Sequence, residues 1–337
     1  MRIGVFCPNW VGDAVMALHF LRVCREKYHQ ATILAISKSW VAPIFENHPS
    51  IDGIISFEKK DLTGFRATSN AGKSLKALDL DQFYLLSDSY RAAYLAKKSG
   101  IIRRIGYPGQ GRSGLLTHVI PHPKQKMHRS LQYLNLLGKQ PKDLNWDPQG
   151  ITLLDREKQW AKNELDNIGL TQPIALFPFS VASSRSVPEL KILEILEKTN
   201  EPILLFGGKG DRAKSEILVE ASQKENIRSV TGHYGLRNSM AMISQCKGAL
   251  AADSGLGHIS ANLGIPTVSL FGAGDPDQTR PIGQRTQVLI ENVHCSPCLK
   301  NKCYNRDEPL LCLEAIHPKS PWDALSELSG NFNFEAV

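Results

Sequence analysis

Short apolar segments alternate with helix-length amphipathic stretches along almost the whole chain, and this alternation limits the fold more than any other feature. The apolar segments are nearly continuous, which is typical of strands buried on both faces of a parallel sheet. Strands joined by helices form right-handed βαβ units, so the pattern predicts a doubly wound α/β fold. The expected strands are Ile3–Cys7, Ala31–Ile36, Gly53–Phe57, Phe83–Leu86, Ile174–Phe177, Ile203–Phe206, Gly248–Ala252, Thr267–Phe271 and Val288–Ile290.

The strand–helix pattern occurs twice in the 337 residues, which predicts two domains at roughly 150 residues each. Turn-forming residues concentrate around 139–150, and a helix is expected from Asp155 to Asn167, ended by Gly169. We therefore expect two Rossmann-like domains, over residues 1–168 and 169–320, that face each other across a cleft. A last helix within 321–337 is a candidate to pack back on the first domain.

Forty lysine and arginine residues against 33 aspartate and glutamate residues give the chain a charge of +7. That excess favours an anionic partner, such as a phosphorylated metabolite, an anionic membrane surface or nucleic acid, with solubility alone as the alternative. The sequence lacks long runs of like charge and basic stripes interleaved with aromatic residues, so we expect no nucleic acid. The apolar run in Met1–Pro8 is too short for a signal peptide, and we expect a cytoplasmic protein.

The turn after the first expected strand, Pro8–Asp13, carries the first candidate for chemistry. Gly12 permits a tight turn and Asp13 stands at the start of the next helix, where it could simply cap that helix. Ligands of open α/β sheets bind beyond the carboxyl ends of the strands, which is where this turn lies. A carboxylate at a helix amino terminus stays ionised, so Asp13 is also suited to act as a general base.

In the second half, a strand is followed by Asp253 and by a small-residue helix that opens at Ser254. Backbone N–H groups of Ser254, Gly255 and Leu256 would bind a phosphate or diphosphate at that helix end. His258 lies close by and could equally be a structural histidine.

Two further strands of this half end in loops suited to a nucleotide. One loop holds Ser183, Ser184 and Arg185, which offer hydroxyl groups and a cation. The other holds Gly207–Asp211, where Asp211 could bind ribose hydroxyls. Three such strand-end loops in one domain together predict a nucleotide site.

Gly109–Gly114 matches the dinucleotide-binding pattern G-x-G-x-x-G but stands in the wrong context. The pattern should close the first strand of a domain, with an acid about twenty residues further on. Neither condition holds here, so we interpret the segment, with Arg112, as a basic loop facing the cleft and the acceptor.

Several motifs together resemble the bacterial ADP-heptose:lipopolysaccharide heptosyltransferases of glycosyltransferase family 9, and most of all their heptosyltransferase II branch. Asn9–Ala17 resembles the opening motif of that family, and Ala252–Ala261 resembles its second signature. Further similarity lies in Pro266–Gly272 with Asp275-Pro276, in Arg104–Tyr107, and in His128 before Tyr133–Leu137. The similarity covers nearly the whole chain, in the family's order.

The resemblance implies a GT-B fold, in which the amino-terminal domain binds the acceptor and the carboxy-terminal domain binds ADP-heptose. It further implies that heptose passes to a lipid A–Kdo-type lipopolysaccharide precursor with inversion, and that no metal or cofactor is required. The resemblance implies that Asp13 is the catalytic base and that Asn9 and Trp10 bind the acceptor. It implies that Asp253 contacts the heptose and that Ser254, Gly255 and Leu256 bind the diphosphate, with His258 nearby. It also implies that Asp211 binds the ribose and that the backbone at Tyr234 contacts the adenine side.

Two departures from the family pattern concern charged positions. Arg185 stands three residues before Pro188, where the family usually has lysine, and Val187 replaces a tryptophan. Arginine keeps a charge for phosphate but presents it as a planar fork. Asp88 stands where heptosyltransferase II tends to show asparagine, so details of the acceptor are open.

Other readings stay open at this point. A family 9 transferase with another sugar or acceptor, a two-domain binding protein for a small molecule, and a nicotinamide oxidoreductase are the alternatives. The missing opening glycine fingerprint disfavours the oxidoreductase. The positive charge fits a phosphorylated, membrane-embedded acceptor, with peripheral contact at the inner leaflet of the inner membrane.

Four of the seven cysteines, Cys295, Cys298, Cys303 and Cys312, fall within one 18-residue stretch. In a cytosolic chain such a cluster favours metal over disulfides, and four thiolates would satisfy a tetrahedral zinc site. Reduced thiols or partial pairing are the alternatives.

Overall fold

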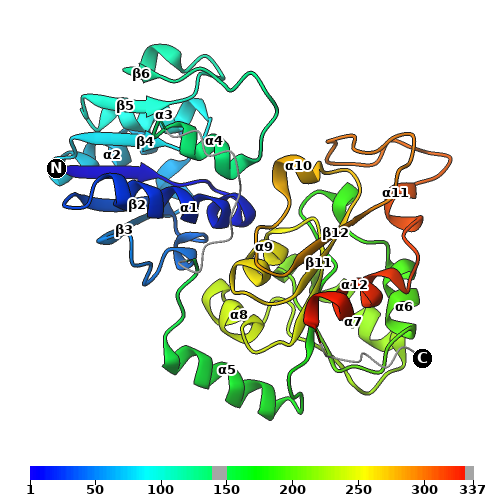
Figure 1. The fold of residues 1–337 in the computed structure, drawn as a ribbon. Coiled ribbons are helices and arrows are strands. Elements are labelled where there is room, and N and C mark those ends of the chain that lie inside the picture. The colour runs from blue at the N-terminus through cyan, green and yellow to red at the C-terminus, as the bar shows by residue number, and fades with distance from the viewer. Residues whose placement is uncertain (139–149, 331–337) are drawn as a thin grey trace. The chain divides into compact units, whose positions relative to one another are not determined.

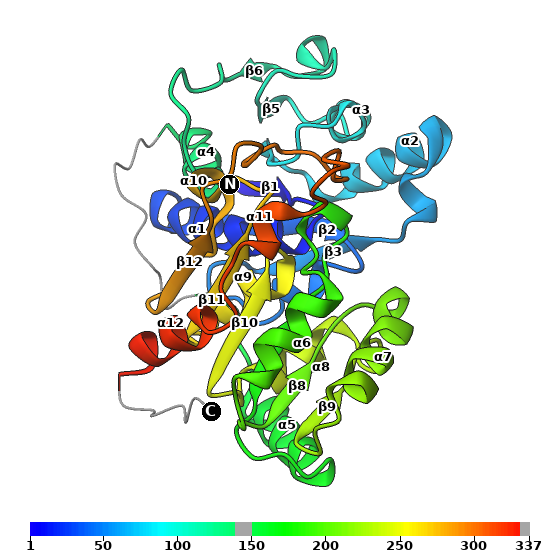
Figure 2. The same ribbon diagram turned by 90° about the vertical axis from the view of Figure 1, so that its right-hand side faces the viewer.

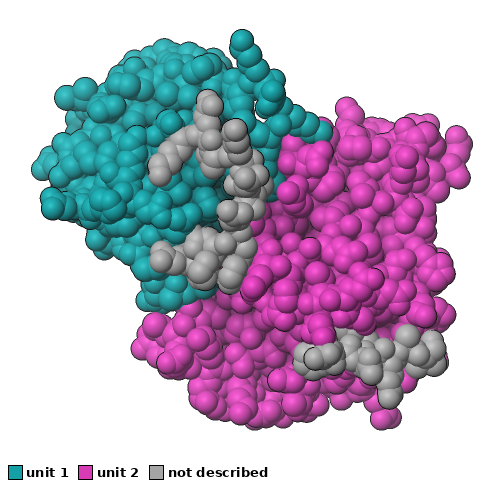
Figure 3. Space-filling view, in the orientation of Figure 1, with its two compact units in different colours: residues 1–152 teal, residues 153–337 magenta. Residues whose placement is uncertain are grey.

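The computed structural model describes residues 1–138 and 150–330. The chain divides into two compact units, Met1–Thr152 and Leu153–Val337, which we call unit 1 and unit 2 (Figure 3). The turn-rich segment at 139–149 and the last residues, 331–337, lie outside the described part. Each unit is described by itself below.

Unit 1 is a six-stranded parallel sheet in the order β3-β2-β1-β4-β5-β6. Helices α2 and α3 pack together over one face of this sheet, and α1 and α4 pack together over the other (Figure 2). Its elements are β1 (Arg2–Phe6), α1 (Val11–Lys27), β2 (Thr32–Lys38), β3 (Gly53–Phe57), α2 (Gly64–Ser74), β4 (Gln82–Leu85), α3 (Tyr90–Lys98), β5 (Arg103–Gly106), β6 (His118–Val119) and α4 (Arg129–Asn135).

Unit 2 is a second six-stranded parallel sheet, in the order β12-β11-β10-β7-β8-β9. Its paired strands β11 and β12 are labelled in Figure 1. Apolar residues of α6, α7, α11 and α12 share one core with this sheet, while α5 packs against α8. Its elements are α5 (Asp155–Asn167), β7 (Ile174–Phe177), α6 (Glu189–Glu197), β8 (Ile203–Leu205), α7 (Arg212–Ser222), β9 (Ile227–Ser229), α8 (Leu236–Ile243), β10 (Gly248–Ala252), α9 (Gly255–Asn262), β11 (Thr267–Phe271), α10 (Pro276–Thr279), β12 (Thr286–Ile290), α11 (Leu311–Glu314) and α12 (Ser320–Ser329).

The α/β fold with two doubly wound parallel sheets is confirmed, and both sheets follow the same connection order. All nine expected strands are present within a residue or two of their expected ends. The strands β5, β6 and β9 were not expected. Each is short, and β5 opens with two arginines, so none carries the continuous apolar run that identified the others.

The units divide sixteen residues earlier than the expected boundary after residue 168. Helix α5 belongs to unit 2, because Glu157 accepts two hydrogen bonds from Arg237 of α8, at 2.6 and 2.7 Å. The last helix, α12, also belongs to unit 2. Trp322 is buried in the unit 2 core and its indole N–H donates to the Ile195 carbonyl at 2.8 Å.

Each sheet has one place where the strand order reverses. In unit 1 this is the junction of β1 and β4, and in unit 2 it is the junction of β7 and β10. The loops that leave the carboxyl ends of such a strand pair diverge to opposite faces, which opens a crevice for ligands. The candidate residues are therefore examined at these two junctions.

None of the helices in the described residues is long and apolar enough to cross a bilayer.

Candidate active site

Two carboxylates stand at the strand junction of unit 1. Asp13 lies in the first turn of α1, after β1, and Asp88 lies in the loop between β4 and α3. The amino-terminal cap of α1 is Trp10, whose side chain makes no capping hydrogen bond. The partial positive charge at that helix end favours the ionised form of Asp13.

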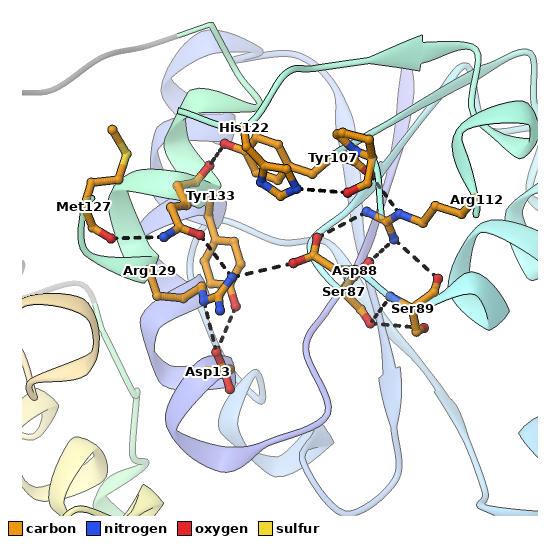
Figure 4. Close-up of polar contacts among 12 residues, drawn as sticks. Asp13, Ser87, Asp88, Ser89, Tyr107, Arg112, His122, Met127, Arg129 and Tyr133 are labelled. Atoms are coloured by element: carbon orange, nitrogen blue, oxygen red, sulfur yellow. Dashed lines mark hydrogen bonds and ion pairs between the residues drawn. The ribbon is translucent and has the colours of Figure 1, made fainter. Parts of the chain in front are cut away.

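Helix α4 supplies two side chains that hold Asp13 (Figure 4). The phenol of Tyr133 donates a hydrogen bond to Asp13 Oδ1 at 3.2 Å, and Arg129 Nε lies 3.8 Å from the same oxygen. Arg129 Nη1 also lies 3.6 Å from Asp88 Oδ2, so one guanidinium stands between the two carboxylates. Burial, and then the Asp13 charge, raise the pKa of Tyr133 well above its ordinary value, which keeps the phenol a donor.

Arg112 differs from its expected role as a cation exposed toward the acceptor. Its side chain is completely buried, and it donates to the carbonyls of Ser87 and Tyr107 and to Asp88 Oδ1 (Figure 4). The guanidinium therefore ties the loop after β5 to the loop after β4, and through Asp88 it reaches the Arg129 network. Gly109–Gly114 leads into a 3₁₀ turn, Ser113–Leu115, rather than a helix, which agrees with rejecting it as a dinucleotide fingerprint.

Asn9 and Trp10 lie at the same end of β1 as Asp13. Trp10 is 62% exposed, and the Oδ1 atom of Asn9 is buried without a hydrogen bond. A second indole, that of Trp40 after β2, donates to the Asn9 carbonyl at 2.9 Å and is 42% exposed. Two exposed indoles and a buried amide oxygen without a hydrogen bond therefore occur in the loops after β1 and β2.

In unit 2 the strand junction brings together Arg185, after β7, and Asp253, after β10. Arg185 Nε lies 3.4 Å from Asp253 Oδ2, and Asp253 is 6% exposed. Burial raises the pKa of the Asp253 carboxyl above its usual value, and the neighbouring Arg185 opposes that shift. The hydroxyl of Ser180, also after β7, donates to the Asp253 carbonyl at 3.1 Å and holds the two loops together.

Three buried polar atoms at this junction make no hydrogen bond: Asp253 Oδ2, Arg185 Nε and Ser254 Oγ. Two of them, Asp253 Oδ2 and Arg185 Nε, form the ion pair described above. Buried polar atoms are nearly always hydrogen-bonded, so this cluster is a candidate ligand site. Ser254 is the amino-terminal cap of α9 and makes no capping hydrogen bond, which leaves the first N–H groups of that helix for a ligand anion.

Glycines shape the space around the Asp253 carboxylate. A Cβ at Gly274 would lie 1.9 Å from Asp253 Oδ2, so no larger residue fits beside that oxygen. A Cβ at Gly257 would lie 2.9 Å from Ala251 Cβ, which explains how α9 packs close to β10. Gly255 and Leu256 lie in the partly exposed first turn of α9, and His258 lies buried one turn further on.

Ser183 and Ser184 make contacts that the sequence did not predict. The Ser184 hydroxyl donates to the Lys300 carbonyl at 2.5 Å, and the Ser183 hydroxyl donates to the Asn301 carbonyl at 3.4 Å. The segment that contains Lys300 therefore supports the loop of Arg185 from outside the sheet. Ser183 stays exposed while Ser184 is buried, so Ser183 is the more accessible of the two.

Asp211 and Tyr234 lie at the ends of the neighbouring strands β8 and β9. Asp211 Oδ2 accepts a hydrogen bond from the Gly208 N–H at 3.0 Å, which orders the turn after β8 and keeps the carboxylate partly exposed. The Tyr234 phenol donates to Glu164 of α5, and burial together with Glu164 raises the pKa of Tyr234 to about 12. The Tyr234 side chain is thus committed to α5, which is compatible with a backbone contact to a ligand.

The four clustered cysteines are free thiols, with Cys298 and Cys303 exposed and Cys312 buried. Burial, and then the nearby Cys295, Cys298 and Cys303, raise the pKa of Cys312. Over residues 1–138 and 150–330, no group of three His, Cys, Asp or Glu side chains is arranged to hold a metal ion. The geometry therefore does not support the zinc interpretation.

The sequence did not identify Arg129 and Tyr133 as site residues. Candidates were sought in the loops that directly follow expected strands, and helix α4 does not follow one. The spacing of four between Arg129 and Tyr133 places both side chains on one face of α4, next to Asp13. The second indole, Trp40, was missed for a similar reason: only the parallel pairing of β1 with β2 brings it beside Asn9.

The comparisons with known proteins point to one family. Residues 69–307 match the family model described as glycosyltransferase family 9 (heptosyltransferase). Lipopolysaccharide heptosyltransferase 2 of Escherichia coli K12 is 27% identical over 307 residues, which cover 86% of this chain and 88% of that protein. Lipopolysaccharide heptosyltransferase 2 of Salmonella typhimurium is 26% identical over 308 residues, with the same coverage.

Among solved structures, E. coli ADP-heptose LPS heptosyltransferase II superposes with a TM-score of 0.80 at 23% identity, covering 98% of each chain. A glycosyl transferase family 9 structure from Veillonella parvula gives a TM-score of 0.81 at 20% identity and 97% coverage of each chain. These similarities show that the fold is GT-B. The family model spans more than half of the sequence, and the chain therefore belongs to glycosyltransferase family 9, the heptosyltransferase family.

Proposed function

We propose that this enzyme transfers heptose from ADP-L-glycero-D-manno-heptose to the inner core of a lipopolysaccharide precursor, with inversion at the anomeric carbon. Unit 2 binds the donor and unit 1 binds the acceptor. The observation that supports this most is that each unit carries polar residues at its own strand junction: a hydrogen-bonded carboxylate, Asp13, in unit 1, and buried polar atoms without hydrogen bonds around Asp253 in unit 2. The names of the relatives supply the sugar and the acceptor class.

The donor subsite is built for a diphosphate and a sugar. The free N–H groups at the start of α9 bind the diphosphate, and Arg185 adds a planar cation beside them. Asp253 accepts hydrogen bonds from hydroxyl groups of the heptose, which satisfies its buried Oδ2 atom. Asp211 accepts from the ribose at the end of β8, and the backbone at Tyr234 contacts the adenine.

The acceptor subsite surrounds Asp13. Trp10 and Trp40 offer exposed indole faces to sugar rings, and Asn9 Oδ1 accepts a hydrogen bond from a sugar hydroxyl. The acceptor is a lipid A–Kdo-type precursor. The chain works in the cytoplasm, in peripheral contact with the inner leaflet of the inner membrane.

The reaction is a single displacement. An acceptor hydroxyl oxygen attacks the anomeric carbon while its proton passes to Asp13, and the bond from that carbon to the diphosphate oxygen breaks. ADP leaves with the bonding electrons, and its growing charge is offset by Arg185 and the amino terminus of α9. Tyr133 and Arg129 fix the orientation of the Asp13 carboxylate, which receives the proton. No metal ion is required for these steps.

A donor and acceptor screen with the purified enzyme tests the proposal. We expect ADP release from ADP-heptose only when a lipopolysaccharide precursor is present, with little release from ADP-glucose or UDP-sugars. The anomeric configuration of the product, measured by NMR, should be opposite to that of the donor. Efficient transfer from a different nucleotide sugar would show that the proposed donor is wrong, although the chain would remain a family 9 transferase. Retention of configuration at the anomeric carbon would refute the single displacement.

A further inference from the structure

The positive charge of the chain resides entirely in unit 1. Residues 1–152 contain 21 lysine and arginine residues against 11 aspartate and glutamate residues, whereas residues 153–337 contain 19 against 22. From Ser89 to Lys142 the sequence has eleven lysines and arginines and no acidic residue. The proposed donor is anionic, but it binds unit 2, which has no excess of cationic residues. The excess in unit 1 therefore has a different partner.

Exposed aromatic rings gather on the two helices that cover one face of the unit 1 sheet. Phe65 of α2 is 67% exposed, and its ring packs edge-on against the rings of Tyr90 at 6.3 Å and Tyr94 at 5.4 Å, both on α3. The helices can approach closely because a Cβ at Gly72 would lie only 2.5 Å from the Leu95 carbonyl oxygen. The opposite sides of α2 and α3 face the core, and Phe65 and Tyr90 are exposed, so the aromatic cluster belongs to the outer surface.

Cations surround this cluster, and the two helices carry no acid. Residues 62–78 and 89–102 contain no aspartate or glutamate. Lys98 Nζ lies 5.3 Å from the centre of the Tyr94 ring, and Arg66 and Lys97 are exposed. We name the outer surface of Phe65, Arg66, Tyr90, Arg91, Tyr94 and Lys97 the α2–α3 face.

We infer that the α2–α3 face docks on the surface of an anionic lipid bilayer. Phenylalanine and tyrosine rings insert at the boundary between headgroups and acyl chains, and lysine and arginine side chains pair with anionic headgroups. The combination of cations and exposed rings without an acid complements a surface that is both anionic and apolar, as a bilayer of anionic lipids is. The inference rests on the proposed function, because a lipid-anchored acceptor must be reached at the membrane.

Vesicle flotation of the full chain, without donor or acceptor, tests the docking. We expect the protein to float with phosphatidylcholine vesicles that contain about one third phosphatidylglycerol at low salt, and to remain unbound with phosphatidylcholine alone or at high salt. The double variant Arg66→Gln/Lys97→Gln should lower the partition coefficient on the order of 30-fold, at about fivefold per cation. Phe65→Ser should lower it roughly tenfold, through lost insertion of one ring.

Matched variants in unit 2 control for general effects of charge and exposed apolar surface. Lys162→Gln/Lys214→Gln removes two exposed cations, and Leu190→Ser removes a side chain that is 72% exposed. Both should float like the unchanged protein. All variants should transfer heptose to a deacylated, water-soluble acceptor at unchanged rates, and those of the α2–α3 face should be slower only with acceptor embedded in anionic vesicles.

The possible failures are distinguishable. If the unchanged protein does not float, or if the variants of the α2–α3 face float as well as the unchanged protein, the docking is overturned. Transfer of heptose to the soluble acceptor in the same case would still support the function. Absent transfer with salt-sensitive flotation overturns the function alone. A concentration-dependent dimer that Phe65→Ser abolishes, without flotation, would instead assign the face to self-association and overturn the docking.

Discussion

The two units share one sheet topology and place their polar residues at the same strand junction, but those residues are in different states. In unit 1 the Asp13 carboxylate already contacts Tyr133 and Arg129. In unit 2 the corresponding loops leave Asp253 Oδ2, Arg185 Nε and Ser254 Oγ buried without hydrogen bonds. Asp13 has a hydrogen bond from a neighbouring side chain, whereas Asp253 has an ion pair with Arg185 but no hydrogen bond to Oδ2.

The difference follows from what each unit does in the proposed reaction. A base must be oriented before the acceptor arrives, because a misplaced proton acceptor loses much of the rate. A donor subsite gains affinity when ligand atoms satisfy buried polar groups that water cannot reach. Substitutions at the unit 1 junction should therefore act on the rate of the chemical step, and those at the unit 2 junction should act on donor binding as well.

The largest effect is expected for Asp13→Asn, which keeps the shape of the side chain and removes the base. We expect the single-turnover rate to fall on the order of 1,000-fold at saturating donor, with ADP affinity unchanged. Asp88→Asn is the matched control, because Arg129 contacts Asp88 as well as Asp13 but Asp88 follows β4 and Asp13 follows β1. A rate within tenfold of the unchanged enzyme would remove Asp13 from the mechanism.

Arg185→Gln tests the unit 2 junction. The change removes the cation beside the diphosphate and leaves the buried Asp253 without its ion pair, so kcat/KM should fall roughly 100-fold. Weaker binding of ADP-heptose, measured by calorimetry, should account for part of the loss. Arg185→Lys keeps the charge without the planar fork and should lose less. Unchanged donor affinity in Arg185→Gln would break the proposed contrast between the units.

Much of the fold was predictable because nine strands carry continuous apolar runs, and the strand-end loops followed from them. The pairing of Arg185 with Asp253 was not predictable from their positions, since it requires β7 and β10 to be neighbours in the sheet. The role of Arg112 was mistaken because a sequence shows a charge but not its burial. A loop arginine that satisfies backbone carbonyls looks the same as one that awaits an anion.

Tyr133→Phe and Arg129→Gln test whether the Asp13 carboxylate is positioned in advance. Each removes one contact to Asp13, and we expect kcat to fall about tenfold with KM nearly unchanged. Tyr107→Phe is the control, because that phenol donates to the Gln132 carbonyl on α4 without touching Asp13. Equal losses in Tyr107→Phe would indicate a general disturbance of α4.

The smallest effect concerns stability rather than rate, and tests why α5 belongs to unit 2. Arg237 holds the pKa of Glu157 below its usual value, chiefly through their paired hydrogen bonds. A carboxyl group with a lowered pKa in the folded state stabilises the fold above its unfolded pKa, and this stabilisation is lost as pH falls through the folded value. Glu157→Gln should therefore lower the free energy of unfolding by about 1 kcal/mol at neutral pH. The difference from the unchanged protein should shrink in urea titrations at acidic pH, whereas a difference independent of pH would show that α5 is held by apolar packing instead.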